Sequence, residues 1–173
     1  MSQLHQIQLK FVPLEDRLLL LLNTSDKAEF KLWLTRRYVK LLWQTLLQLL
    51  EKSMTHHHYT DPQKTAAILS FQHEQVIKNA DFSSQYEQKP QATMPLGNEP
   101  ILVSKIQIKQ RDDDVQVLCL HPDEGKGIEI ALDETLLHSF CKILSEAVKN
   151  TEWDLDLQIS SQHVDISQKQ WIN

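Results

Sequence analysis

The first part of the chain alternates apolar and polar residues in a way that predicts β-strands. The stretch 3–12 alternates isoleucine, leucine and phenylalanine with glutamine and lysine, which is typical of a strand with one buried face. The stretch 17–23 is apolar on both faces, so we expect it to be central in its sheet. The stretch 28–34 alternates again and is followed by Thr35, whose side chain can cap a helix that runs to about Lys52.

The same order of elements returns in the second half of the chain. The stretches 101–109, 115–120 and 127–132 are predicted strands, and Asp133 is the predicted N-cap of a helix that runs to about Asn150. A shift of 98 residues aligns the second strand through the helix of one half with those of the other half without a gap. The chain therefore has an internal repeat, and duplication of one unit is a hypothesis that this pattern favours.

The remaining segments complete the predicted α+β fold. Asp61 and Pro62 are a favourable helix start, so a helix is expected over about 61–81 and a polar loop after it. The alternation from Trp153 to Ile159 predicts a final C-terminal strand. We predict two tandem β-β-β-α units with antiparallel sheets, joined by a helix and a polar loop in one compact globular domain. The first unit covers 1–53, the linker 54–99, the second unit with the final strand 100–159, and a polar tail 160–173.

Composition and charge narrow the class of protein. The 173 residues are 41% apolar and 24% charged, and the net charge of −5 disfavours broad nonspecific binding of nucleic acid. The start of the chain lacks the pattern of a secretory signal, and the run Leu18 to Leu22 is far shorter than the roughly 20 residues of a membrane helix. We expect a cytoplasmic protein without a membrane segment, with Cys119 and Cys141 reduced and buried.

Two segments carry a resemblance to known proteins. The sequences EDRLLLLLNTSDKAEFKLWLTRRYVKLLW and GIEIALDETLLHSFCKILSEAV resemble a family of short bacterial cytoplasmic proteins, and this resemblance implies no activity, cofactor or catalytic residue. The layout of tandem units, each with several strands and one helix, is similar to that of the PUR and Whirly single-strand nucleic-acid binders. Those proteins have four strands per unit, whereas three are predicted here, and no diagnostic motif of theirs is present.

Two histidine motifs are candidates for metal binding, and each has a simpler explanation. The run His56-His57-His58 sends its side chains in different directions on a helix or a strand, and further ligands at suitable spacing are missing. His73 begins a pattern like that of zinc proteases, but Ile77 stands where the second histidine is required. We interpret His73 as a hydrogen-bonded histidine at the core or its edge.

Two turns complete the set of candidate motifs. The run Asp112-Asp113-Asp114 lacks the alternating acids, central glycine and distal glutamate of a calcium loop, which favours a hairpin turn. The turn that begins at His121 has two glycines but not the spacing of a phosphate-binding loop. We therefore predict no catalytic residue, no cofactor-binding residue and no metal ligand.

The outer face of the first unit is the remaining candidate for a binding surface. Cations beside an aromatic ring suit single-stranded nucleic acid, because charge attracts phosphate and the ring stacks on a base. A protein partner is the other occupant of this candidate face. Its residues are Lys10, Lys31, Trp33, Arg36, Arg37 and Lys40.

The helix after Thr35 favours a protein partner. Its leucines and Trp43 cover more than half of its circumference, so the central helix, the second unit or another copy of the protein must cover it. We predict a non-catalytic bacterial interaction or adaptor protein, which binds a protein partner or forms a homodimer. A single-stranded nucleic-acid binder is the alternative, and an enzyme with an unrecognised site is the third class.

Overall fold

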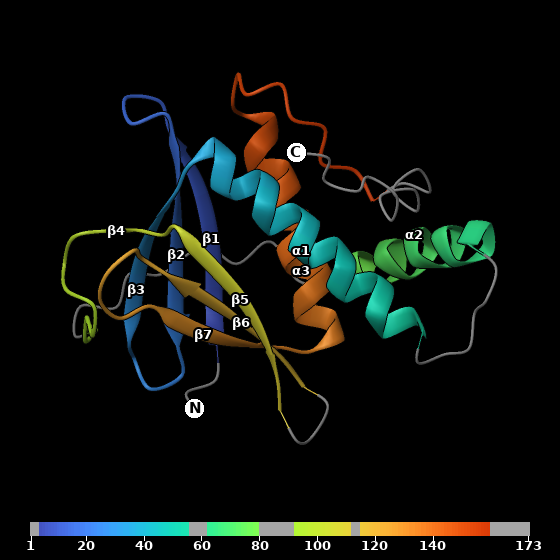
Figure 1. The fold of residues 1–173 in the computed structure, drawn as a ribbon, viewed down its shortest axis with the longest axis horizontal. Helices are drawn as coiled ribbons and strands as arrows, with labels where there is room; N and C mark the ends of the chain where they lie inside the picture. The colour runs from blue at the N-terminus through green and yellow to red at the C-terminus, as the bar shows by residue number, and fades with distance from the viewer. Residues whose placement is uncertain (1–3, 56–61, 80–91, 112–114, 160–173) are drawn as a thin grey trace, which may run out of the picture.

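The computed structural model describes residues 4–55, 62–79, 92–111 and 115–159. Within these ranges the chain forms two β-sheets and three α-helices, which confirms the predicted α+β class (Figure 1). The first sheet has the strand order β1-β2-β3-β4, and the second has the order β5-β6-β7.

The first sheet is formed mainly by the alternating stretches near the N-terminus. Its central strand β2 pairs antiparallel with β1 and β3, as its two apolar faces predict. Leu18, Leu20 and Leu22 of β2 face the core and are at most 1% exposed. The strands of this sheet are β1 (Leu4–Val12), β2 (Arg17–Thr24), β3 (Glu29–Leu34) and β4 (Ile101–Leu102).

The second sheet is a three-stranded antiparallel meander. Its central strand β6 carries Leu118 and Leu120 into the core, where neither is exposed. Ile128 and Ile130 of β7 face the same side. The strands of this sheet are β5 (Lys105–Gln110), β6 (Gln116–His121) and β7 (Ile128–Leu132).

The prediction of one continuous strand over 101–109 is wrong, because the chain changes sheets within it. β4 pairs parallel with β3, whereas β5 pairs antiparallel with β6. The amide of Val103 donates to the carbonyl of Trp33 at 3.2 Å, and the amide of Ser104 donates to the carbonyl of His121 at 2.9 Å. Two successive amides therefore bond to different sheets, a corner that periodicity alone does not reveal.

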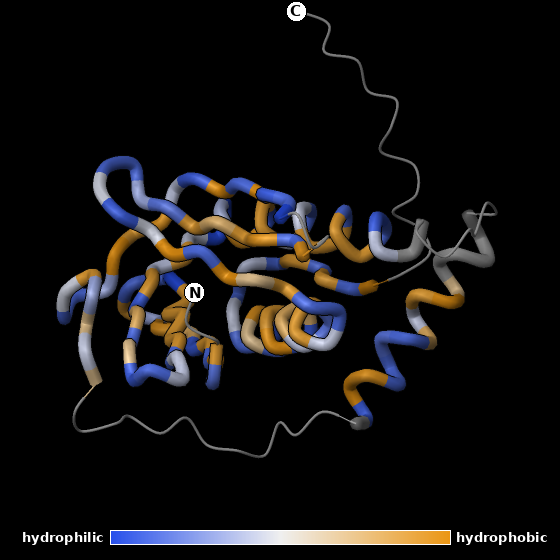
Figure 2. Tube along the Cα trace, turned by 90° about the horizontal axis from the view of Figure 1, so that it is seen from below, coloured by the Kyte–Doolittle hydropathy of each residue, from blue (hydrophilic) through white to orange (hydrophobic). Residues whose placement is uncertain are grey.

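The three helices are α1 (Arg36–Thr55), α2 (Pro62–Asn79) and α3 (Glu134–Lys149). Thr35 caps α1, because its hydroxyl oxygen accepts a hydrogen bond from the amide of Tyr38 at 3.2 Å. Asp133 caps α3 in the same way, with the amide of Leu136 at 2.7 Å. The predicted cap of α2, Asp61, lies outside the described residues. Two views place α2 at the end of the molecule farthest from the sheets (Figures 1 and 2).

One hydrophobic core joins both sheets and all three helices. Leu42 and Leu46 of α1 and Phe140 and Leu144 of α3 are fully buried within it. Most of the apolar arc of α1 is thus covered inside a single chain, although Leu41 remains 41% exposed. The width of that arc therefore gives no separate argument for a homodimer.

The elements of the two halves follow the offset found in the sequence. β3 ends at Leu34 and β7 at Leu132, while α1 begins at Arg36 and α3 at Glu134. The sheets themselves differ, because β4 extends only the first one. Duplication of a single unit remains a hypothesis.

The prediction of a final strand from Trp153 to Ile159 is also wrong, since no strand forms there. Its alternation still has a structural cause. Trp153 is 3% exposed, packs edge-to-face against Phe11 and donates its indole N–H to Asp16. Leu155, Leu157 and Ile159 are partly buried against the core, so the segment packs every second side chain on the core without joining a sheet.

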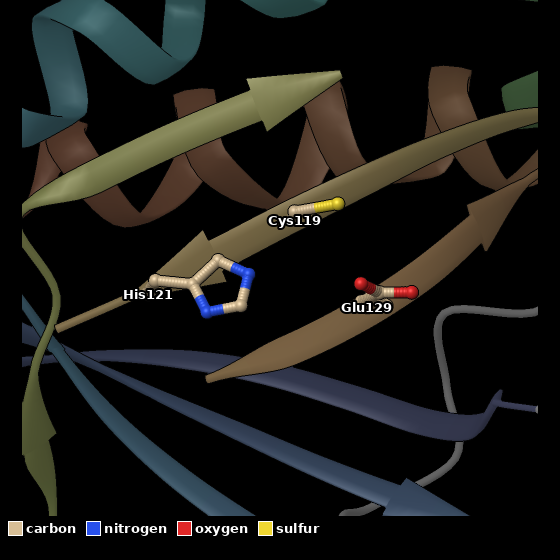
Figure 3. Close-up of side chains that lie close together, drawn as sticks. All are labelled: Cys119, His121 and Glu129. Carbon is tan, nitrogen blue, oxygen red and sulfur yellow. The ribbon is translucent and has the colours of Figure 1, made fainter. Parts of the chain in front are cut away.

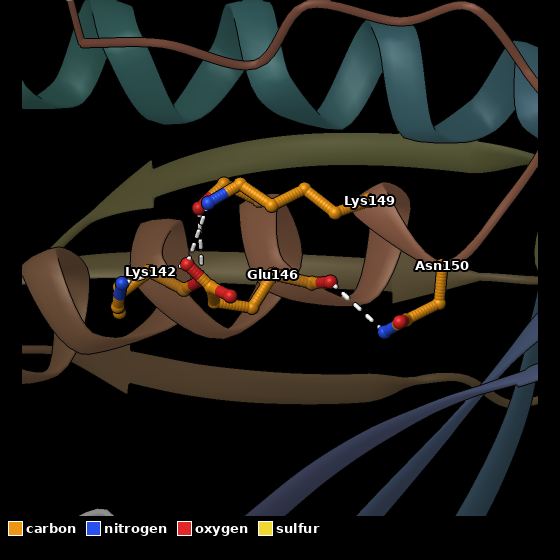
Figure 4. A network of polar contacts seen from close by, with 5 residues as sticks. Lys142, Glu146, Lys149 and Asn150 are labelled. Carbon is orange, nitrogen blue, oxygen red and sulfur yellow. Dashed lines mark hydrogen bonds and ion pairs between the residues drawn. The ribbon is translucent and has the colours of Figure 1, made fainter.

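The solvent face of α3 is stabilised by a small ionic network (Figure 4). The Glu146 carboxylate accepts from Lys142 at 2.7 Å and from Lys149 at 2.8 Å. These two bonds lower the pKa of Glu146 to about 2. The side chain of Asn150 bonds to the Glu146 carbonyl at 3.2 Å and so helps to end the helix.

Candidate functional site

A cleft of about 680 Å³ lies between β7 and one end of the first sheet. Leu22 and Phe30 line its first-sheet side, and Leu136 and Ser139 of α3 line another part of its wall. In Figure 1 this region lies where β7 crosses the beginning of β1 and the end of β2. Both sheets and the start of a helix therefore contribute to one concave surface.

β7 borders this cleft with its edge rather than with one face. Ile128 and Ile130 point to the core and Glu129 and Ala131 point outward, yet all four line the cleft. In the part of the chain that the structure describes, no other strand pairs with the outer edge of β7. Peptide groups on the unpaired side of an edge strand are available to an added strand.

Three polar groups of the cleft have structural roles. The Asp133 carboxylate caps α3, and the Thr24 hydroxyl oxygen accepts from the amide of Ala28 at 3.1 Å. The Glu129 carboxylate accepts from the ammonium group of Lys109. These three groups are thus engaged in contacts within the fold, and the apolar walls of the cleft suit binding.

A second feature lies beside the cleft, on the outer face of the second sheet (Figure 3). Cys119 and His121 are two residues apart on β6 and so point to the same face. Glu129 of β7 lies directly opposite Cys119 in the antiparallel register. One ligand atom from each of the three side chains lies within 4.8 Å of the other two.

Gly127 allows the chain to approach this cluster closely. A Cβ atom at Gly127 would collide with the carbonyl oxygen of Leu120 and would lie 2.5 Å from His121 Nδ1. Gly127 directly precedes β7, whose second residue is Glu129. The glycine therefore permits the strand to begin beside His121.

The electrostatics of this cluster argue against a nucleophilic cysteine. The side chains of Lys109 on β5 and Glu129 on β7 form an ion pair that must cross β6, because β6 lies between them. Cys119, on the outer face of β6, is fully buried. Burial, followed by the nearby Glu129 carboxylate, raises the pKa of the Cys119 thiol. A nucleophilic thiolate requires the opposite shift and an accessible sulfur.

The candidate face predicted from the sequence is only partly assembled. Lys10 and Trp33 lie in one row across the outer face of the first sheet, with Leu19 between them. Leu102 of β4 continues the row and is 45% exposed. Lys10 is exposed and Trp33 is half-buried. Arg36, Arg37 and Lys40 are exposed on the first turns of α1.

Lys31 differs from the other cations of that face. Its side chain is only 19% exposed, and its ammonium group lies 3.4 Å from the carboxylate of Glu29. The Glu29 side chain is 1% exposed. The charge of Lys31 is therefore used within the fold, where it compensates a buried carboxylate.

A pair of histidines, His138 buried and His73 half-buried, joins α2 to α3. Nδ1 of His73 lies 3.1 Å from Nδ1 of His138, and His138 is 1% exposed. Nε2 of His138 has no hydrogen-bond partner among the described residues. A bare nitrogen acceptor costs less to bury than an unpaired N–H, so we infer that His138 Nδ1–H donates to His73. This contact agrees with the interpretation of His73 as a hydrogen-bonded histidine.

The other motifs considered in the sequence lie partly outside the residues that the structure describes. The runs His56-His57-His58 and Asp112-Asp113-Asp114 lie outside the described residues. The turn after His121 leads into β7 and not into a helix. Cys119 and Cys141 are free and buried, as predicted.

Sequence reasoning missed the cleft, the three-residue cluster and the histidine pair. The cluster depends on the register that sets Cys119 opposite Glu129, which hairpin pairing of the predicted strands 115–120 and 127–132 would have suggested. The cleft and the histidine pair depend on how distant elements pack, and no local sequence signal marks that.

Comparisons with known proteins add no family assignment, since no family model, curated protein or solved structure matches the chain. Among the helices within the described ranges, none combines the length and the apolar character that crossing a membrane requires.

Proposed function

We propose that this chain is a cytoplasmic bacterial interaction protein without catalytic activity, which binds an extended segment of a protein partner in the cleft along β7. The observation that carries this proposal is the outer edge of β7 on one wall of the cleft, with which none of the described strands pairs. An extended peptide can add to such an edge, because its main-chain groups complete the hydrogen-bond ladder.

The chemistry of the cleft also defines the bound segment. β7 spans five residues, so the added strand needs a similar length. On one side of that strand, alternate side chains would meet Leu22, Phe30 and Leu136, which favours apolar residues at those positions. On the other side they would face solvent, which favours polar residues. The partner sequence is therefore expected to alternate apolar and polar residues.

Random heptapeptides selected by display on the immobilised full-length protein provide the test. Selected peptides should alternate in polarity, and their binding should slow amide hydrogen exchange in 128–132. Thr135→Trp, at an exposed cleft residue, should weaken this binding at least about tenfold because the indole would occupy the cleft. Thr93→Trp, at an exposed residue outside the cleft lining, is the matched control. Equal binding to both variants, or no selected peptide, would reject the proposal.

Binding of single-stranded nucleic acid is the second candidate function. The row formed by Lys10, Leu19 and Trp33 supports it, since it sets an exposed cation near a partly exposed ring. The net charge of −5 and the internal pairing of Lys31 weigh against it. Labelled single-stranded DNA and RNA should then bind in a salt-sensitive way, and Trp33→Ala should weaken that binding. No binding at low salt, where attraction to phosphate is strongest, would remove this candidate.

A further inference from the structure

We propose that Cys119, His121 and Glu129 form a binding site for a divalent transition metal ion of the Zn²⁺ class. The site lies on the outer face of β6 and β7 and shares Glu129 with the lining of the cleft. Thiolate, imidazole and carboxylate are the three protein ligand types that zinc takes, and a three-ligand site leaves a fourth position open for water or another ligand.

The positions of the ligand atoms support this assignment. Bond lengths of 2.0–2.3 Å around a tetrahedral ion require ligand atoms about 3.3–3.8 Å apart. The three atoms already lie within 4.8 Å of one another, so movements of about 1 Å at the side-chain ends would bring them to one ion. Cys119 and Glu129 are held opposite each other by the ladder, and His121 is on the same strand as Cys119. The backbone thus fixes the approximate geometry before any ion binds.

The ion pair over β6 places the ammonium group of Lys109 on one of the proposed ligands, Glu129. The Lys109 ammonium bonds to Glu129 beside Cys119, and the Lys109 side chain is 48% exposed. The neighbouring Lys105 is bound by Asp123 at 3.1 Å, so its charge is partly compensated. A metal ion would take the place of the Lys109 ammonium on Glu129 and release that flexible side chain to solvent.

The proton balance of binding follows from the three side chains. The Cys119 thiol loses its proton to solvent when its sulfur binds the ion, and the ion binds an imidazole nitrogen of His121 that carries no proton and the Glu129 carboxylate. The ion therefore replaces a thiol proton and one ammonium contact.

Cobalt(II) titration of the reduced full-length protein tests the proposal, because a thiolate bound to cobalt gives a charge-transfer band in the near ultraviolet. We expect a saturable band at one ion per chain, which zinc chloride then removes by displacement. The band should be absent from Cys119→Ser and retained in Cys141→Ala, whose cysteine is the only other one in the chain. Replacement of His56, His57 and His58 by glutamine should leave the band unchanged, since imidazole alone does not produce it.

Two further variants keep the test decisive if Cys119→Ser does not fold. His121→Asn should weaken cobalt binding at least about tenfold while circular dichroism shows a native fold, since one of three ligands is lost. Lys109→Gln should strengthen binding, because it removes the competing cation from Glu129. Absence of the band in the native chain, its survival in Cys119→Ser, or equal affinities of the native chain and His121→Asn would overturn the proposal.

Discussion

Replacing Lys31 with methionine is expected to lower the free energy of unfolding by about 2–3 kcal/mol at neutral pH. The Glu29 side chain is 1% exposed, and the Lys31 ammonium at 3.4 Å compensates its charge. One Glu29 carboxylate oxygen is already buried without a hydrogen-bond partner among the described residues. Loss of Lys31 would leave the carboxylate buried and uncompensated, which is among the costliest changes a single substitution makes. Urea unfolding followed by circular dichroism measures the loss.

A double-mutant cycle separates this effect from the loss of the lysine stem. Glu29→Gln combined with Lys31→Met should recover most of the stability, because no buried charge remains. Lys105→Met is the matched control, since Lys105 also pairs with an acid, Asp123, but both side chains are more than half exposed. Its effect should stay below about 0.5 kcal/mol. Equal losses for Lys31→Met and Lys105→Met would show that Lys31 does not compensate a buried charge.

The local elements of this fold follow from its sequence, because each has a strong local signal. The apolar faces of 17–23 predict a central strand, and β2 is central. Thr35 and Asp133 predict helix starts, and both side chains accept the expected capping bonds. Periodicity and capping depend on neighbours within a few residues, and the sequence states those directly.

Pairing between strands is less predictable, because it depends on contacts between distant residues. The alternation around Val103 and Ser104 indicates an extended chain but not that it leaves one sheet for another. The alternation from Trp153 to Ile159 likewise indicates one buried face. In the structure that face is buried by the core and by the contact of Trp153 with Phe11, without a ladder. A strand needs both a buried face and a neighbouring strand to pair with, and the alternation of apolar and polar residues indicates only the buried face.

The candidate surface shows the same limit for side chains. The sequence places Lys10, Lys31 and Trp33 on one face, and the register agrees that all three point away from the core. The sequence does not indicate that Glu29 is buried beside Lys31. Alternation predicts the face of the sheet on which a side chain lies, but not whether neighbouring residues cover that side chain. Lys31 is therefore better explained as a structural cation than as a ligand for phosphate.

Lowering the pH from about 7 to about 5 is expected to destabilise the contact between α2 and α3. Burial, with smaller contributions from His138 and Lys142, lowers the pKa of His73 from 6.5 to about 4. Burial also lowers the pKa of His138, which nearby Glu134 partly opposes. Both histidines are thus neutral in the folded protein at a pH where the unfolded chain binds protons. The stabilisation from neutral His73 is complete above about pH 6.5 and is lost as the pH falls towards about 4, and that from His138 is lost in the same direction.

Unfolding in urea at these two pH values, for the native chain and for His73→Gln, tests this linkage. The stability of the native chain should fall by about 1–2 kcal/mol more than that of His73→Gln, a figure reduced for the partial exposure of His73. The glutamine oxygen can still accept from His138 but gains no charge, so only part of the dependence, that of His138, should remain. His5→Gln, at an exposed histidine of β1, should retain the native pH dependence. If His73→Gln retains the full pH dependence of the native chain, protonation of the histidine pair does not control the docking of α2 on α3.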